Sequence, residues 1–208
     1  MSEAMGRFLA FEGIDGSGKT TQLARLAARI RSMDLRCYET REPTDGPVGA
    51  LVHNIMTGRV KADSRVVAAL FAADRLDHVL NGTNGILELL NQGTHVLTDR
   101  YYFSSYAYHS VDMPMDWVIA LNSQCAQVLR PTATIFIDVS PEVSLERIAK
   151  NRFHTELYET RERLTATRQR YLEAFEKQKD AENIIVLNGD LDPDQLEEQV
   201  WRAVKQYF

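Results

Sequence analysis

The sequence predicts one α/β domain, and three observations point to this class. Five short segments, each about the length of a strand and most of them apolar, alternate with longer segments in which apolar residues recur at helical spacing. A glycine-rich loop joins the first run to the first helical segment. Hydrophobic residues make up 44% of the 208 residues, which is ample for one core, and no linker or low-complexity tract divides the chain. We therefore expect residues 1–208 to form a single domain.

The first strand is expected from Arg7 to Phe11, and a glycine-rich loop follows it. Glycines let backbone N–H groups turn toward phosphate oxygens, and a helix that begins near Lys19 adds the positive end of its dipole. Lys19 can reach the outer phosphates, and the Thr20 hydroxyl is placed to ligate the magnesium ion of a nucleotide. A plain strand-to-helix turn is the weaker alternative, because the buried strand and the apolar helical face supply the context that a phosphate-binding loop requires. The residues expected to bind a nucleoside triphosphate are Gly13, Ile14, Asp15, Gly16, Ser17, Gly18, Lys19, Thr20 and Thr21.

Charge and cysteine content narrow the class of protein. Twenty-four basic and 29 acidic residues give a net charge of -5, which argues against a non-specific nucleic-acid binder, so phosphate recognition must be local. Cys37 and Cys125 lie in apolar segments without metal-ligand spacing, as expected for core residues of a reduced, cytoplasmic protein. Met1 to Gly6 is too short and too polar for a signal peptide, and no apolar run approaches the ~20 residues that span a bilayer. We expect a soluble enzyme with no nucleic-acid or membrane partner.

Two further strands end in charged residues that can bind an anion or a metal. After a strand over residues 35–40, Arg41 lies where parallel α/β sheets carry ligand-binding residues, although a solvated ion pair is an equal alternative. A strand over residues 94–98 ends in Asp99 and Arg100. Asp99 can hold magnesium through water, and Arg100 can clamp a phosphate with two hydrogen bonds. A helix-initiating Asp beside an exposed Arg is the weaker alternative.

Between these strands, Asp63 or Ser64 is expected to cap a long helix that carries Phe71 and Arg75 on one face. A flat ring beside a planar fork of donors can hold a nucleobase, with Phe71 on its face and Arg75 at its carbonyl oxygens. For Phe71 alone, packing in the core is the favoured interpretation. An aromatic cluster over residues 101–108 is expected to line a pocket or an interface.

The second half of the chain continues the alternation. A helix from Met115 to Leu129 precedes a strand from Thr132 to Asp138, and Pro141 can begin the next helix. The basic segment 146–154 is expected to be a mobile lid over phosphates or, as a slightly favoured alternative, a solvated helix end. A long charged helix through residues 171–175, a strand at 184–187 and a closing helix from Asp192 follow.

Five segments occur in an order that resembles the thymidylate kinase family, enzymes that phosphorylate thymidine monophosphate. They are Phe11 to Thr21, Thr40 to Pro43, Leu70 to Arg75, Asp99 to Tyr108 and Glu156 to Glu159. The similarity covers roughly residues 7 to 190. It implies a P-loop NTPase-type three-layer α/β sandwich with a parallel sheet of about five strands flanked by helices. It also implies a short lid at approximately residues 147–158 and assembly as a homodimer.

The resemblance implies roles for individual residues as well. Asp15 is expected at the 3′-hydroxyl of the acceptor, Arg41 and Arg100 at its phosphate, Phe71 on the face of thymine, and Arg75 at the edge of the base. Further implied acceptor-site residues are Asp99, Ser104, Tyr108, Tyr158 and Glu159. Mg²⁺ is expected at Thr20 and Asp99, and Lys19 and Arg100 are expected to be catalytic cations.

One position departs from the family pattern. Many members carry a basic residue directly after the loop carboxylate, where this chain has Gly16, and other members supply arginines from the lid. Phosphoryl transfer spreads negative charge over several oxygens, which some cation must offset. We therefore expect Arg152 to be a catalytic residue, with Arg147 and Lys150 as the other candidates.

The expected reaction is direct in-line transfer from ATP, with Mg²⁺, to the phosphate of dTMP, which gives dTDP for dTTP biosynthesis. The nearest alternative is a deoxynucleoside kinase, which would need a general base and fewer acceptor-site arginines. A distant alternative is a P-loop nucleotide switch. That class predicts an Asn-Lys-x-Asp motif and an Asp-x-x-Gly motif after the third or fourth strand, and neither occurs.

Overall fold

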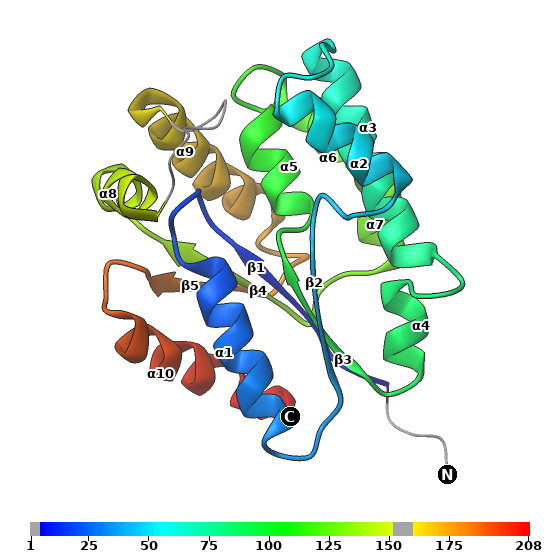
Figure 1. Cartoon of the computed structure of the whole chain (residues 1–208), viewed down its shortest axis with the longest axis vertical. Coiled ribbons are helices and arrows are strands. Elements are labelled where there is room, and N and C mark those ends of the chain that lie inside the picture. Colours follow the sequence, from blue (N-terminus) through cyan, green and yellow to red (C-terminus); the bar gives the residue numbers. More distant parts are fainter. Residues whose placement is uncertain (1–4, 152–159) are drawn as a thin grey trace.

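The computed structural model of the protein describes residues 5–151 and 160–208 (Figure 1). Its centre is a five-stranded sheet in which all paired strands are parallel, in the order β2-β3-β1-β4-β5. The strands are β1 (Phe8–Glu12), β2 (Cys37–Arg41), β3 (His95–Asp99), β4 (Ala133–Asp138) and β5 (Ile184–Asn188). The predicted fold class is confirmed.

Helices cover both faces of the sheet and complete three layers (Figure 1). On one face, α1 (Lys19–Arg31) packs against α10 (Pro193–Val204). On the other, α5 (Tyr102–His109) packs against α9 (Arg161–Gln178), and α4 (Ile86–Asn91) contacts β3. The remaining described helices are α2 (Pro47–Met56), α3 (Ser64–Leu80), α6 (Met115–Leu121), α7 (Ser123–Val128), α8 (Pro141–Asn151) and the short 3-10 helix η1 (Lys205–Tyr207).

The central strands are buried on both faces, which explains their continuous apolar sequences. Leu9, Ala10 and Phe11 in β1 are wholly buried. The edge strands are more open, since Tyr38 in β2 and Val186 in β5 are exposed. The functional loops follow the carboxyl ends of β1, β2 and β3, where open α/β sheets place their ligands.

The structure moves several expected strand boundaries by one residue, as for β1, which lies at Phe8–Glu12 and not at Arg7–Phe11. Other differences are larger or concern the site. The second strand lies at Cys37–Arg41, not over residues 35–40, so Arg41 is its last residue. The helix expected from Met115 to Leu129 is divided into α6 and α7 at Asn122. The Asn122 side chain is wholly buried and accepts a hydrogen bond of 2.5 Å from Arg75 in α3. The break therefore lies at a long-range polar contact that apolar spacing does not reveal.

Residues 147–151 of the expected lid are the end of α8, and the rest of the lid lies outside the described residues.

The described part of the chain contains no helix that is both long enough and apolar enough to cross a bilayer.

Both cysteines are free thiols, with Cys125 buried and Cys37 half-buried. Burial raises the pKa of Cys37 to about 11, so this thiol is protonated at neutral pH.

Candidate active site

The loop between β1 and α1 has the backbone geometry of an anion-binding turn. Gly13, Gly16 and Gly18 have φ angles of 150°, 73° and 96°, which residues with a side chain rarely adopt. A Cβ atom on Gly18 would meet no atom of the described residues within 4 Å, which leaves room for a ligand beside this part of the backbone. The predicted phosphate loop is thus present as a local structure, directly before the N-terminus of α1.

Lys19 is held in the middle of this loop. Its Nζ atom donates to the Ile14 carbonyl oxygen at 3.0 Å and to Ser17 Oγ at 3.4 Å, and the residue is only 5% exposed. Burial and the nearby charge of Arg100 lower the pKa of Lys19 to about 8. A bound polyphosphate would favour the ammonium form and replace these weak contacts with charge-assisted ones.

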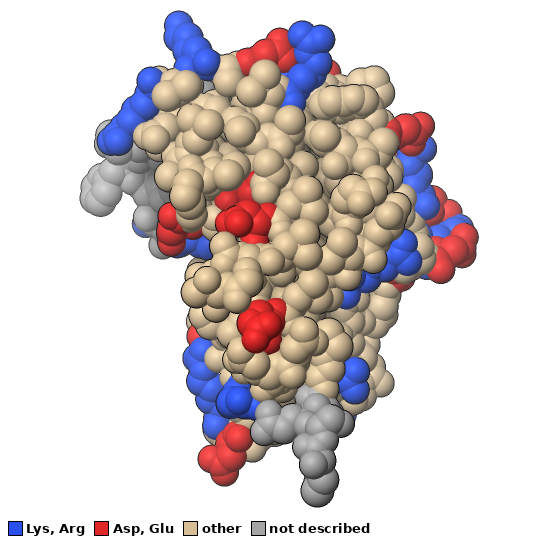
Figure 2. Space-filling model, turned by 90° about the vertical axis from the view of Figure 1, so that its right-hand side faces the viewer, with Lys and Arg blue, Asp and Glu red and all other residues tan. Residues whose placement is uncertain are grey.

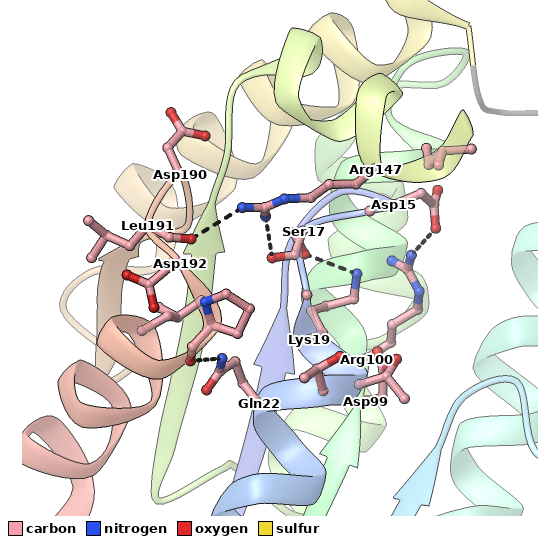
Figure 3. A pocket seen from close by; sticks show the side chains of 17 residues that line it. Asp15, Ser17, Lys19, Gln22, Asp99, Arg100, Arg147, Asp190, Leu191 and Asp192 are labelled. Atoms are coloured by element: carbon pink, nitrogen blue, oxygen red, sulfur yellow. Dashed lines mark hydrogen bonds and ion pairs between the residues drawn. The ribbon is translucent and has the colours of Figure 1, made fainter. Parts of the chain in front are cut away.

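A cavity of about 730 Å³, here named the loop cavity, opens beside the phosphate loop (Figure 3). Its walls come from Asp15–Gln22, the end of β3, α8 and the segment Asp190–Pro193 that begins α10. This volume lies in the range of nucleotide and cofactor sites. The residues predicted from the motif to bind a triphosphate line it from Asp15 to Thr21.

Arg147 is the lid candidate that lies at the loop cavity. From α8, its guanidinium donates to the carbonyl oxygens of Ser17 at 3.4 Å and Leu191 at 3.3 Å (Figure 3). It also donates to the Gly189 carbonyl oxygen at 2.9 Å. Lys150 instead pairs with Glu146 at 2.6 Å, and 70% of its side chain is exposed. Arg152 lies outside the described residues, so its predicted role stays a prediction.

The structure explains why Gly16 departs from the family pattern. Besides its positive φ, a Cβ atom at this position would come within 2.7 Å of the Ser144 carbonyl oxygen in α8. Any side chain, basic ones included, would therefore displace α8 from the phosphate loop.

Thr20 and Asp99 meet at the edge of the loop cavity. The Thr20 hydroxyl donates to Asp99 Oδ2 at 2.5 Å, whereas Asp99 Oδ1 is buried and has no hydrogen-bond partner among residues 5–151 and 160–208. A hydroxyl and a carboxylate are the hard oxygen donors that Mg²⁺ prefers, so these residues fit the predicted metal. The described residues hold no group of three or more His, Cys, Asp or Glu side chains able to bind a metal, so nucleotide phosphates and water would supply the other ligands.

Arg100 connects the phosphate loop to a second cavity. Its Nη2 atom donates to Asp15 Oδ1 at 2.6 Å, and Nη1 donates to Ser104 Oγ at 3.1 Å. The Tyr108 hydroxyl donates to the other Asp15 oxygen at 2.8 Å. Arg100 adopts a φ of 75°, which is strained for a non-glycine residue and is held by a backbone hydrogen bond of 2.9 Å to Phe11. Strain of this kind is typical of functional sites.

Sequence reasoning missed Glu12, the last residue of β1, whose carboxylate holds Ser104 and its neighbours in place. Its carboxylate is wholly buried and accepts hydrogen bonds from the Tyr101 backbone N–H at 2.8 Å, the Ser104 hydroxyl at 2.6 Å and the Tyr171 hydroxyl at 2.9 Å. Burial raises the pKa of Glu12. One feature of the sequence could have indicated this role, because Glu12 is a single acidic residue at the end of an apolar strand. A carboxylate that is buried there needs hydrogen-bond partners.

The second cavity, here named the inner cavity, has a volume of about 200 Å³. Helices α2, α3 and α5 form its walls, and Asp15 and Arg100 lie at its junction with the loop cavity, since both residues line both cavities. Phe71, Arg75, Ser104 and Tyr108 line it as well. The structure thus brings together six of the predicted acceptor-site residues, whereas Tyr158 and Glu159 lie outside the described part of the chain.

Arg75 forms a buried network at the base of the inner cavity. Its Nε atom donates to Glu42 Oε2 at 2.7 Å, and the two side chains are 1% and 2% exposed. Nη1 donates to Ser105 and Asn122, and Nη2 contacts Glu42 and the Tyr101 carbonyl oxygen. These five contacts equal the number of N–H groups on a guanidinium. The predicted contact of Arg75 with a base would therefore require one of them to be exchanged.

Arg41 lies apart from the inner cavity. It borders a third hollow of about 770 Å³ along β2, which also includes Thr20 and Asp99. Its guanidinium pairs with Asp45 at 2.9 Å, and 64% of the side chain is exposed. Its predicted contact with the acceptor phosphate stays a prediction.

The fold and this site define a class: a P-loop nucleotide-binding protein in which a second, smaller cavity meets the phosphate loop at Asp15 and Arg100. The family model "Thymidylate kinase" matches residues 11–200. The chain belongs to this family, and the predicted resemblance is confirmed.

Curated proteins from several organisms are similar to this chain over most of their own length. A thymidylate kinase from Bradyrhizobium sp. is 34% identical over 97% of this chain and 90% of its own. A thymidylate kinase from Ligilactobacillus salivarius is 34% identical over 90% of this chain and 92% of its own. A probable thymidylate kinase from Pyrobaculum calidifontis is 41% identical over 79% of this chain and 80% of its own.

Proposed function

We infer that the protein transfers the γ-phosphoryl group of ATP to dTMP and so supplies dTDP for dTTP synthesis in the cytoplasm. Family membership supports the reaction. The structural observation that carries it is the shared border of the two cavities, because a triphosphate and a monophosphate bound in them would meet at Asp15 and Arg100. In-line transfer needs this arrangement of two anions end to end.

In this mechanism the protein positions two polyanions and offsets their charge. The backbone N–H groups of the phosphate loop and Lys19 hold the phosphates of ATP, while Arg100 binds the acceptor phosphate. Asp15 accepts a hydrogen bond from the 3′-hydroxyl of the acceptor. No covalent enzyme intermediate is needed, because the acceptor phosphate oxygen attacks the γ-phosphorus directly.

Thr20 and Asp99 would hold Mg²⁺ together with the nucleotide. The metal, when bound, neutralises charge on the β- and γ-phosphates. Arg147 is the described lid candidate nearest to this region, and Arg152 is the other candidate for the cation at the transferred group.

An acceptor assay tests the function against its nearest alternative. Thymidine, dTMP and dUMP are each offered with ATP and Mg²⁺, and ADP formation is followed. We expect kcat/KM for dTMP to exceed that for thymidine by at least about 100-fold, because thymidine has no phosphate for Arg100 to bind. Preference for thymidine would identify a deoxynucleoside kinase instead.

We also propose that the protein is a homodimer. Figure 2 shows a broad face with few basic side chains, interrupted by acidic ones, on the side where α2 and α3 lie. Leu51 in α2 and Val66 and Leu80 in α3 are 40%, 49% and 53% exposed. Exposed apolar residues grouped on neighbouring helices are typical of interfaces.

Light scattering tests this assembly. We expect a mass of twice 23.7 kDa for the native chain and a monomer for Val66→Glu, since a carboxylate would be buried without a partner. As a control, Val186→Glu on the edge strand β5 should leave the mass unchanged. A monomeric native chain at micromolar concentration would contradict the proposal.

A further inference from the structure

Tyr171 in α9 brings a hydroxyl to the carboxylate of Glu12 at the end of β1. Both residues are wholly buried. The Tyr171 ring packs against Phe136 and Phe175, with centroid distances of 4.9 and 5.8 Å. Its hydroxyl lies 2.9 Å from Glu12 Oε2 and 2.8 Å from Ser104 Oγ, and either oxygen can accept its proton. The ring is thus held by apolar packing, while the hydroxyl belongs to a buried polar cluster.

Four donors surround the Glu12 carboxylate in this cluster. Oε1 accepts from the backbone N–H groups of Tyr101 at 2.8 Å and Ser104 at 3.1 Å. Oε2 faces the hydroxyls of Ser104 and Tyr171. Because an N–H group cannot accept a proton, the ionised carboxylate, which only accepts, fits these partners best. The four donors offset the burial that raises the pKa of Glu12.

The Ser104 hydroxyl connects this carboxylate to Arg100. It donates its proton to Glu12 Oε2 at 2.6 Å, which leaves its lone pairs for other donors. Arg100 Nη1 donates to the same hydroxyl oxygen at 3.1 Å. Arg100 Nη2 donates to Asp15 at 2.6 Å (Figure 3). Since a carboxylate cannot donate, Glu12 fixes the direction of the Ser104 proton and thereby the side of the hydroxyl that faces the guanidinium.

The backbone of Arg100 is fixed as well. At a φ of 75°, its N–H donates to the Phe11 carbonyl oxygen at 2.9 Å, and its own carbonyl oxygen accepts from the Thr98 hydroxyl at 2.9 Å. Side-chain torsions therefore decide where the guanidinium lies. Nη1 also approaches the Gly13 carbonyl oxygen, at the longer distance of 3.4 Å, so Ser104 provides its shorter contact. Without Ser104, the guanidinium could pivot about its contact with the phosphate loop.

We propose that Tyr171 and Glu12 are positioning residues for phosphoryl transfer, which act through the Ser104 hydroxyl to orient the Arg100 guanidinium toward the acceptor phosphate. The proposal rests on the function inferred above and extends it to residues of α9 and β1. Neither residue is among the described residues that line the loop cavity or the inner cavity. A misoriented guanidinium should affect kcat above all, because in-line transfer tolerates little displacement of the acceptor phosphate in the transition state.

Tyr171→Phe tests the proposal, because it removes one hydroxyl and keeps the packed ring. With dTMP, ATP and Mg²⁺, we expect kcat to fall about 10- to 30-fold. KM for ATP should stay within twofold of native, because the phosphate loop and Lys19 are unchanged. Ser104→Ala removes the connecting hydroxyl itself and should lower kcat at least as much. ADP formation measures both variants, and thermal melting verifies that they are folded.

Tyr102→Phe is the matched control. Tyr102 is also wholly buried, and its hydroxyl donates at 2.7 Å to Glu182, whose side chain is 3% exposed. In the described part of the chain, Tyr102 lines neither the loop cavity nor the inner cavity. Both variants take a tyrosine hydroxyl away from a shielded glutamate, so both should lower the melting temperature to a similar extent. Only Tyr171→Phe should lower kcat by more than twofold.

A double-mutant cycle determines whether the effect passes through Arg100. In an Arg100→Met background the guanidinium is absent, so adding Tyr171→Phe should lower kcat by less than a further twofold. A merely structural role of Tyr171 would lower kcat by the same factor in both backgrounds. If Tyr171→Phe does not fold, Ser104→Ala takes its place in the cycle.

The proposal is overturned if Tyr171→Phe keeps kcat within threefold of native, if Tyr102→Phe loses as much kcat, or if the two losses in the cycle multiply. Failure of the inferred function would differ, because the native chain itself would then not phosphorylate dTMP.

Discussion

Replacing Lys19 with methionine is expected to lower kcat by at least about 100-fold at saturating substrates. The Lys19 ammonium is buried in the phosphate loop, where a charge acts through little intervening water and offsets the charge that develops during transfer. Methionine keeps the length and apolar body of the side chain but removes the charge. Coupled ADP assays measure the effect, and thermal melting verifies that the variant is folded.

The matched control is Lys150→Met in α8. This lysine is largely exposed and pairs with Glu146, so its loss should change kcat by less than about threefold. A drop of less than tenfold for Lys19→Met would contradict the catalytic assignment of Lys19.

The same lysine predicts a pH dependence. Because burial lowers its pKa to about 8, the ammonium of the free enzyme loses its proton as the pH rises through 8. kcat/KM for ATP reports the free enzyme and should therefore fall above pH 8, approaching a tenfold loss per pH unit. kcat should hold to higher pH, because bound phosphates favour the ammonium form. A kcat/KM profile that stays flat to pH 10 would argue against this.

Replacing Arg75 with leucine is expected to lower the free energy of unfolding by about 3–5 kcal/mol, because it leaves the Glu42 carboxylate buried without its main partner. In this network the Glu42 carboxylate then keeps one contact with a basic side chain, which is His78 Nδ1 at 3.1 Å. Urea denaturation measures the change. The double variant Arg75→Leu/Glu42→Gln removes the unpaired charge and should recover part of the loss.

Arg65→Leu is the control, because this arginine pairs with Asp63 at the surface and its removal should leave the urea midpoint unchanged. If Arg75→Leu is too unstable to purify, Arg75→Lys tests the same pair, since a single ammonium cannot reproduce the fork of contacts. A loss below about 1 kcal/mol for Arg75→Leu would show that Glu42 is compensated elsewhere.

Features that depend on neighbouring residues in the chain could be predicted from the sequence. The phosphate loop is one, because its glycine φ angles and the start of α1 are local properties of residues 13–20. The central strands β1, β3 and β4 are another, because strands buried on both faces of a parallel sheet require largely apolar runs. The cap at Asp63 and the proline that begins α8 are also local, and both lie where expected.

Features that depend on residues far apart in the chain could not be predicted this way. The break at Asn122 lies at a contact with Arg75, 47 positions away. Glu12 accepts hydrogen bonds from Tyr101, Ser104 and Tyr171, none of which its own segment indicates. His53 had no motif to single it out, and only the packing of α2 against α3 places it at the inner cavity.

The sequence by itself determined the class of fold, the phosphate loop and the family. Each of these depends on short segments and on their spacing along the chain, and both can be read from the sequence directly. Only the tertiary structure decided which charged groups are partnered inside the protein. It shows that Arg75 is already engaged, that Arg41 borders a different cavity, and that His53 Nε2 at the inner cavity has no hydrogen-bond partner among the described residues. The physical reason is that hydrogen bonding and desolvation depend on distances in space, which spacing in sequence does not specify.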